Sequence, residues 1–150
     1  MIQYELEEDI WSWSEKVKTD VWKVCPVNSV GVMGKGLALE FKNRYKYLEK
    51  VYLNAINNGF KAGDIKLVLE DRIILAATKQ HWKDRSQLSF IKKICDNLDT
   101  FEDIISGEVI MPKLGCGLGG LSQEYVFPIL EQYLNNSHVL YYVVGDKKNV

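Results

Sequence analysis

Two glycine-rich loops each connect an apolar segment to an amphipathic one. The first, residues 31–36, reads GVMGKG and ends with a lysine between two glycines, and the second, residues 115–120, reads GCGLGG. Glycine lets backbone N–H groups approach a phosphate closely, and the start of a helix adds a positive dipole. Two such loops on different strands predict a site that holds both phosphates of a pyrophosphate. The alternative is that these glycines only form turns.

Two familiar nucleotide-binding motifs do not account for these loops. A Walker loop requires glycine at position 29 and Ser or Thr after the lysine, where this chain has Ser29 and Gly36. Gly115, Gly117 and Gly120 match the GxGxxG spacing. They lie late in the chain, without the strand and acidic residue that follow this motif in dinucleotide-binding domains.

Lys79 and the segment after it are the main candidates for chemistry. Lys79 ends the apolar run IILAAT, and His81 and Trp82 follow. A polar group at the carboxyl end of an interior strand is well placed for catalysis, His81 is a candidate acid or base, and Trp82 could stack on a base or sugar. The alternatives are a solvated strand end, and a surface turn on which Trp82 is a packing lid. Lys83 and Arg85 are candidates for phosphate contacts.

The composition is that of one soluble globular domain. The chain has 150 residues, 47% hydrophobic and 26% charged, with a net charge of −1. This charge excludes the global basic field of a non-specific nucleic-acid binder, although a local pocket needs only a few donors. The three cysteines, Cys25, Cys95 and Cys116, suggest neither disulfides nor a zinc site, and Cys116 lacks a histidine partner in the sequence. We expect a cytoplasmic monomer with no membrane segment, metal or cofactor.

Apolar periodicity predicts an α/β fold in which about six strands alternate with three longer helices. Strands are expected at residues 2–6, 21–27, 109–114 and 138–144, with two more around a turn at residues 70–72. Helices are expected at residues 37–55, at 86–98 and after Ser122, the predicted N-cap.

Three blocks of sequence resemble the macrodomain family. They are VNSVGVMGKGLALEFKNRY, AATKQHWKDRSQLSFI and MPKLGCGLGGLSQEYV, in the family's order and over most of the chain. The resemblance is closest to the branch that contains the DarG antitoxin and the terminal ADP-ribose protein glycohydrolase. It implies a single macrodomain over residues 1–150, a three-layer α/β/α fold with a mixed six-stranded sheet, and a cleft for ADP-ribose across the strand ends.

The resemblance also assigns roles to residues. Asp9 and Ile10 match the pair that contacts adenine, and Asn28 matches the asparagine beside the distal ribose, which we class with Lys79 as catalytic. Lys79 matches the lysine that acts at the anomeric carbon. The matching ligand-binding positions are Gly34, Lys35, Gly36, Leu37, Thr78, Gly115, Cys116, Gly117, Leu118, Gly119, Gly120 and Leu121.

One position separates the two related activities. The terminal ADP-ribose protein glycohydrolase has an aspartate where this chain has Gly119, and the DarG branch has glycine. The resemblance therefore implies a hydrolase that removes ADP-ribose from a macromolecule, with DNA favoured over protein and a toxin as a possible partner. It leaves the group that transfers protons unidentified. The alternatives are a non-catalytic ADP-ribose reader and an ADP-ribose-1″-phosphate phosphatase.

Overall fold

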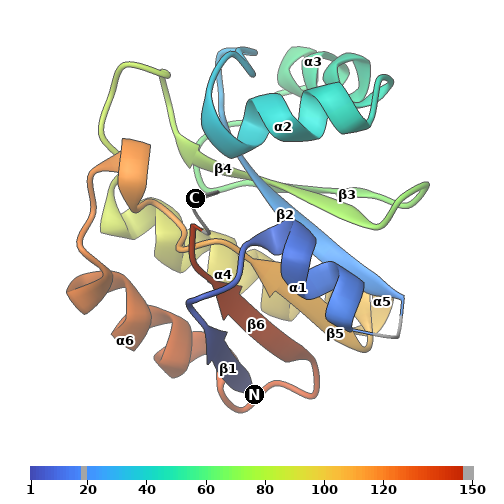
Figure 1. Ribbon diagram of the computed structural model, residues 1–150. Helices are drawn as coiled ribbons and strands as arrows, with labels where there is room; N and C mark the ends of the chain where they lie inside the picture. Colours follow the sequence, from blue (N-terminus) through green and yellow to red (C-terminus); the bar gives the residue numbers. More distant parts are fainter. Residues whose placement is uncertain (18–19, 147–150) are drawn as a thin grey trace.

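The computed structural model describes residues 1–17 and 20–146, which form one six-stranded sheet between two layers of helices (Figure 1). The strand order is β1-β6-β5-β2-β4-β3, and every neighbouring pair is parallel except β3 and β4. The strands are β1 (Ile2–Glu5), β2 (Val21–Asn28), β3 (Ile65–Val68), β4 (Ile73–Lys79), β5 (Glu108–Met111) and β6 (Leu140–Val144).

The central strands are apolar on both faces because both faces are covered. On β4, Ile74 and Ala76 pack into one core cluster, whereas Ile73, Leu75 and Ala77 pack into the other. Successive side chains of a strand point to opposite faces, so one continuous apolar run supplies both cores. The same alternation is found on β2, β5 and β6.

Two sets of helices form the outer layers. Helices α1 (Ile10–Lys16), α2 (Gly36–Arg44) and α3 (Leu48–Asn57) cover one face, and α4 (Leu88–Thr100), the short α5 (Glu102–Ile105) and α6 (Gln123–Leu134) cover the other. The predicted three-layer α/β/α fold with a mixed six-stranded sheet is confirmed. None of the helices that the structure describes combines the length and apolar character needed to cross a membrane.

The single helix predicted for residues 37–55 is wrong, because it is two helices. The backbone of Tyr45 is extended, with φ −122° and ψ 90°, and ends α2. The Tyr45 ring lies 6.0 Å from Phe41 and 6.4 Å from Trp11, centroid to centroid. The apolar period continued across the break because both helices bury residues in the same cluster, including Leu48 and Tyr52.

Other boundaries differ by a few residues. Ser86 was expected inside a helix but precedes α4, which begins at Leu88. The strand expected at residues 109–114 ends at Met111, before Pro112, which has no N–H for a sheet ladder. Helix α1 was not predicted. The turn at residues 70–72 and the Ser122 cap, which accepts from the N–H of Glu124 at 3.2 Å, are confirmed.

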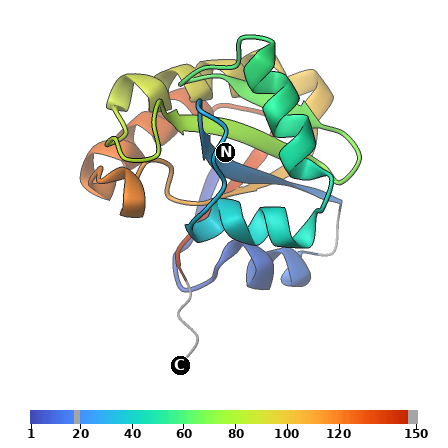
Figure 2. The same ribbon diagram turned by 90° about the horizontal axis from the view of Figure 1, so that it is seen from above.

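The parallel strands β2, β4, β5 and β6 end at the same edge of the sheet. Both views show the loop after β4 beside the short 3-10 helix η1 (Gly117–Gly119) at this edge (Figures 1 and 2). The two glycine loops and Lys79 therefore come together from distant parts of the sequence.

Candidate functional site

A cavity of about 770 Å³ opens at the carboxyl ends of the strands. Its walls come from both glycine loops, the ends of β2 and β4, the turn after β5 and the residues after β6. Of the predicted site residues, it is lined by Asn28, Gly34, Lys35, Gly36, Leu37, Thr78, Lys79, Trp82, Gly115, Cys116, Gly117, Leu118 and Gly119. It is not lined by Asp9, Ile10, His81, Gly120 or Leu121.

Asn28 holds the first glycine loop in shape. It is the last residue of β2 and is buried. Its Oδ1 accepts from the N–H groups of Val30 and Gly31 at 3.0 and 3.1 Å, and its Nδ2 donates to the carbonyl of Val32 at 2.8 Å. The Asn28 side chain therefore hydrogen-bonds to the backbone of its own loop, as asparagine side chains commonly do in turns. The second N–H of the Asn28 amide has no acceptor among the described residues, so it is available to donate to a ligand.

Tyr52 supports Asn28 from the outer layer. This fully buried side chain on α3 places its hydroxyl 2.6 Å from both the carbonyl oxygen and the Oδ1 of Asn28, and the N–H of Gly31 donates to it at 3.2 Å. Burial raises the pKa of Tyr52 to about 12, so the hydroxyl stays protonated and can donate. Sequence periodicity identified Tyr52 as a core residue but gave no sign of this role.

The start of α2 is free to bind an anion. No described residue accepts a hydrogen bond from the backbone N–H groups of residues 34–38. The N-cap, Lys35, makes no side-chain capping bond, and the first turn contains no acidic residue. Unsatisfied N–H groups and the helix dipole favour a negative charge at this end. The residues predicted to hold a phosphate or ribose here therefore lie on the cavity with their donors available.

A β-bulge precedes Lys79. The pairing of β2 with β4 runs Val27 with Ala77 and then Asn28 with Lys79, so Thr78 is the extra residue. A bulge bends the strand and changes the direction of the side chains that follow. The Nζ of Lys79 donates to the carbonyls of Trp82 and Leu118, both at 3.2 Å. This amine thus connects the loop after β4 to the second glycine loop.

The second glycine loop is built around conformations that only glycine adopts easily. Gly115 has φ +75°, and a Cβ there would lie 2.7 Å from Leu121 Cδ1 and 3.0 Å from Ser86 Oγ. The side chain of Leu118 reaches the first loop, because a Cβ on Gly36 would lie 3.3 Å from Leu118 Cδ1. The two loops therefore meet beside the cavity.

The cavity is positively charged although the chain is not. Its ionisable lining includes Lys35, Lys79, Lys83 and Lys113, and the one lining carboxylate among the described residues is Asp146. Burial raises the pKa of the Cys116 thiol, with Lys113 opposing, so the thiol is a poor nucleophile. Our sequence reasoning did not select Lys113 or Asp146. The rule that ligands bind at strand ends could have found both, because they follow β5 and β6.

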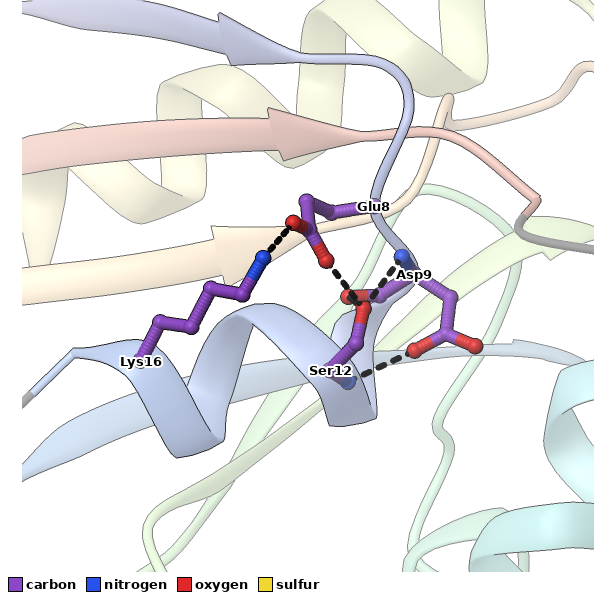
Figure 3. Close-up of polar contacts among 4 residues, drawn as sticks. All are labelled: Glu8, Asp9, Ser12 and Lys16. Atoms are coloured by element: carbon purple, nitrogen blue, oxygen red, sulfur yellow. Dashed lines mark hydrogen bonds and ion pairs between the residues drawn. The ribbon is translucent and has the colours of Figure 1, made fainter.

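Asp9 begins α1 rather than lining the cavity (Figure 3). Its Oδ1 accepts from the N–H of Ser12 at 2.7 Å, and Ser12 Oγ accepts from the N–H of Asp9 at 3.0 Å, forming a capping box. Glu8 accepts from Ser12 Oγ at 2.6 Å and pairs with Lys16. The N–H of Gly145 donates to the carbonyl of Glu8 at 2.8 Å, so this loop runs beside the segment that leads to Asp146.

The remaining predicted residues have other neighbours. Ile10 is buried in the core. His81 Nδ1 accepts from the N–H of Lys83 at 3.1 Å, and its ring lies 5.4 Å from the Trp82 ring. Trp82 is 42% exposed at the cavity. Gly120 and Leu121 lie just beyond the lining: the N–H of Leu121 donates to the carbonyl of Gly115 at 2.9 Å, and the contacts of Gly120 are described below.

In the described part of the chain, no group of three or more His, Cys, Asp or Glu residues is arranged to hold a metal ion. The donors that line the cavity are instead backbone N–H groups and lysines.

The fold and sequence are similar to those of characterised proteins. The chain is 37% identical over 108 residues to the DNA ADP-ribosyl glycohydrolase of Mycobacterium tuberculosis, a match covering 67% of this chain and 31% of that protein. The structure of the macrodomain of M. tuberculosis DarG matches with a TM-score of 0.83 and 32% identity, covering 97% of this chain and 98% of that one. The chain is a macrodomain of the DarG family.

A second relative of this macrodomain comes from Thermosipho africanus. It is a DNA ADP-ribosyl transferase–DNA ADP-ribosyl glycohydrolase fusion protein, 33% identical over 141 residues, with 75% of this chain and 35% of that protein covered. A structure of T. africanus DarTG in complex with ADP-ribose matches with a TM-score of 0.76 and 27% identity, over 87% of this chain and 39% of that one. The macrodomain thus spans about a third of the length of these curated relatives. No protein-family model matches the chain.

Proposed function

We propose that this macrodomain binds ADP-ribose and hydrolyses the bond that joins it to a modified macromolecule, with DNA as the preferred substrate. The observation that carries the proposal is the position of Lys79. Its amine bridges the two loop segments that enclose a cationic cavity at the strand ends. The relative from T. africanus is known in complex with ADP-ribose, and the relatives matched in sequence are named for removal of ADP-ribose from DNA.

In this proposal the two glycine loops hold the pyrophosphate. The free N–H groups at the start of α2 take one phosphate and the second loop takes the other. Asn28 faces the distal ribose, and Asp9 with Ile10 lies at the adenine end, where the Asp9 loop runs beside residues 145–146. Lys35, Lys83 and Lys113 around the cavity attract the two negative charges of the ligand.

The chemical step is addition of water to C1″ of the distal ribose and loss of the nucleobase. The bond from C1″ to the base nitrogen breaks, and the bonding electrons leave with the base. The Lys79 ammonium stabilises the negative charge that develops on the departing nitrogen, which then takes a proton. Because Gly119 provides no acidic side chain, a phosphate oxygen of the substrate receives the proton that the attacking water loses, and this proton passes to the departing nitrogen.

DNA is preferred over protein because the cavity rim suits a nucleotide. Trp82 is a partly exposed aromatic surface, and Lys83 beside it lines the same cavity. Base stacking and phosphate pairing are the usual means of holding a single strand. A DNA ADP-ribosyl transferase that makes the substrate is the corresponding toxin partner. The free cysteines Cys25, Cys95 and Cys116 are consistent with a reducing cytoplasm, where we propose that the protein works as a monomer.

The test uses a single-stranded oligonucleotide that carries one ADP-ribosylated thymine. We expect the parent protein to release ADP-ribose. Lys79→Ala should lower turnover by about 100-fold or more and change ADP-ribose affinity by no more than about threefold. Lys66→Ala, which removes an exposed lysine of β3 outside the cavity, should behave as the parent.

Two outcomes would replace the proposal. Tight binding of ADP-ribose without release from the oligonucleotide would indicate a reader. Release of phosphate from ADP-ribose-1″-phosphate, without action on the oligonucleotide, would indicate the phosphatase. Loss of both turnover and binding in Lys79→Ala would make Lys79 a binding residue only.

A further inference from the structure

Three consecutive carbonyl groups of the second glycine loop accept hydrogen bonds from the end of β4 and the turn that follows it. The Nζ of Lys79 donates to Leu118, the N–H of Ser86 donates to Gly119 at 2.8 Å, and the Nη2 of Arg85 donates to Gly120 at 2.8 Å. We call these three donors the carbonyl strap. It joins segments more than 30 residues apart and holds the loop at three consecutive residues.

Ser86 is the centre of the carbonyl strap. It is a buried polar residue just before α4, and its Oγ donates to the carbonyl of Thr78. Thr78 is the bulged residue of β4, so its carbonyl lies at an irregularity in the sheet ladder, and Ser86 satisfies it. Ser86 thereby connects the strand end that presents Lys79, through its side chain, to the loop that encloses the cavity, through its backbone N–H.

Ser86 packs so closely against the second loop that side chains at Gly115 and Gly119 would crowd it. Ser86 Cβ lies 3.2 Å from the position of a Cβ on Gly119, and Ser86 Oγ lies 3.0 Å from that of a Cβ on Gly115. Arg85 packs in the same way at the other end of the loop, where a Cβ on Gly120 would lie 2.8 Å from Arg85 Nε. The strap and the glycines are therefore complementary in shape as well as in hydrogen bonding.

We propose that Ser86 and Arg85 are positioning residues of the hydrolase, and this rests on the proposed function. Ser86 acts through Lys79, because it fixes the bulge from which Lys79 extends. Arg85 acts through the second glycine loop, because it holds the end of that loop and, with it, the wall of the cavity. Ser86 therefore affects mainly the chemical step, whereas Arg85 affects mainly ligand binding.

The chain offers a matched control in the same turn. Asp84 is exposed, and no described residue makes a side-chain hydrogen bond or ion pair with it. We expect Asp84→Ala to behave as the parent in every measurement. Arg85→Lys retains a cation that can reach a carbonyl, although without the planar fork, and should recover part of what Arg85→Ala loses.

The first measurement is hydrogen exchange of the free proteins over residues 115–121. Arg85→Ala should speed exchange there by about tenfold with little change in the melting temperature, and Arg85→Lys should lie between Arg85→Ala and the parent. Ser86→Ala keeps the N–H that donates to Gly119, so its exchange over these residues should stay within about twofold of the parent. Its melting temperature should fall by a few degrees, because the buried carbonyl of Thr78 loses its donor. The second is ADP-ribose affinity by calorimetry, which should fall by about five- to tenfold in Arg85→Ala. The third is turnover of the modified oligonucleotide, where Ser86→Ala should lower kcat by about tenfold and leave KM within about twofold.

Parent-like exchange over residues 115–121 in Arg85→Ala, or a parent-like kcat in Ser86→Ala, would overturn the inference. So would an equal loss of kcat and affinity in both, in proportion to lost stability, since that marks a purely structural role. A parent that binds ADP-ribose without turnover would refute the proposed function instead, and exchange and affinity would still decide whether the carbonyl strap positions the loop.

Discussion

At the scale of single residues, the cavity depends on side chains that never face it. Tyr52 is fully buried, yet its hydroxyl contacts the carbonyl and the side chain of Asn28 and accepts from Gly31. The first glycine loop therefore has a support in α3 in addition to its own internal bonds. A buried carbonyl that loses its donor costs more than an exposed one, because water cannot replace the bond.

Tyr52→Phe should thus lower the free energy of unfolding by about 1–3 kcal/mol. It should also weaken ADP-ribose binding several-fold, because the first loop loses its external support. Urea unfolding and calorimetry measure the two effects. The matched control is Tyr47→Phe, which removes a hydroxyl bonded to Asp71 at 2.6 Å on a partly exposed turn and should cost less than about 1 kcal/mol. Equal effects of the two changes would contradict a special role for Tyr52.

At the scale of elements, irregularities in otherwise regular structure create the site. The bulge at Thr78 precedes Lys79, the start of α2 lacks a side-chain cap, and α1 begins at a capping box on Asp9. The uncapped helix lies on the cavity and the capped one lies outside its lining. By the sequence resemblance Asp9 is also the residue that we propose to contact adenine, so capping and binding must be separated experimentally.

Two changes at Asp9 separate these roles. Asn caps a helix about as well as Asp, whereas Ala costs about 1 kcal/mol. Asp9→Asn should therefore preserve the free energy of unfolding within about 0.5 kcal/mol and still weaken ADP-ribose binding by about tenfold, because the adenine amino group loses a charged acceptor. Asp9→Ala should lower both. If Asp9→Asn binds ADP-ribose as the parent does, Asp9 is only a cap.

At the scale of the whole molecule, the two cores on either side of the sheet contain buried ionisable groups. Burial raises the pKa of Cys95 to about 12 and also raises that of Cys25. These thiols are neutral in the folded protein over a pH range in which they ionise in the unfolded chain. The unfolded chain then binds fewer protons than the folded protein, so stability falls as pH rises.

We expect full stability below about pH 8.5 and a progressive loss above it, of at most about 1.4 kcal/mol per pH unit for each thiol. Urea unfolding between pH 7 and pH 10 measures the loss. Cys95→Ala should start from a lower stability, because it leaves a small cavity, but should show a shallower decline above pH 8.5. A decline as steep as that of the parent would mean that Cys95 does not contribute to it.

The sequence by itself determined the fold class, because continuous apolar runs mark strands that are buried on both faces and helical apolar periods mark helices that are buried on one face. It also identified the two glycine loops, Lys79 and the Ser122 cap, because glycine placement and strand ends are local features. Tertiary structure decided the rest. The break at Tyr45 depends on aromatic packing against Trp11, the support by Tyr52 crosses from one layer to a strand end, and the carbonyl strap joins β4 to a loop about 40 residues away in the sequence. No local pattern encodes these contacts, since each forms only when the sheet brings distant segments to the same edge.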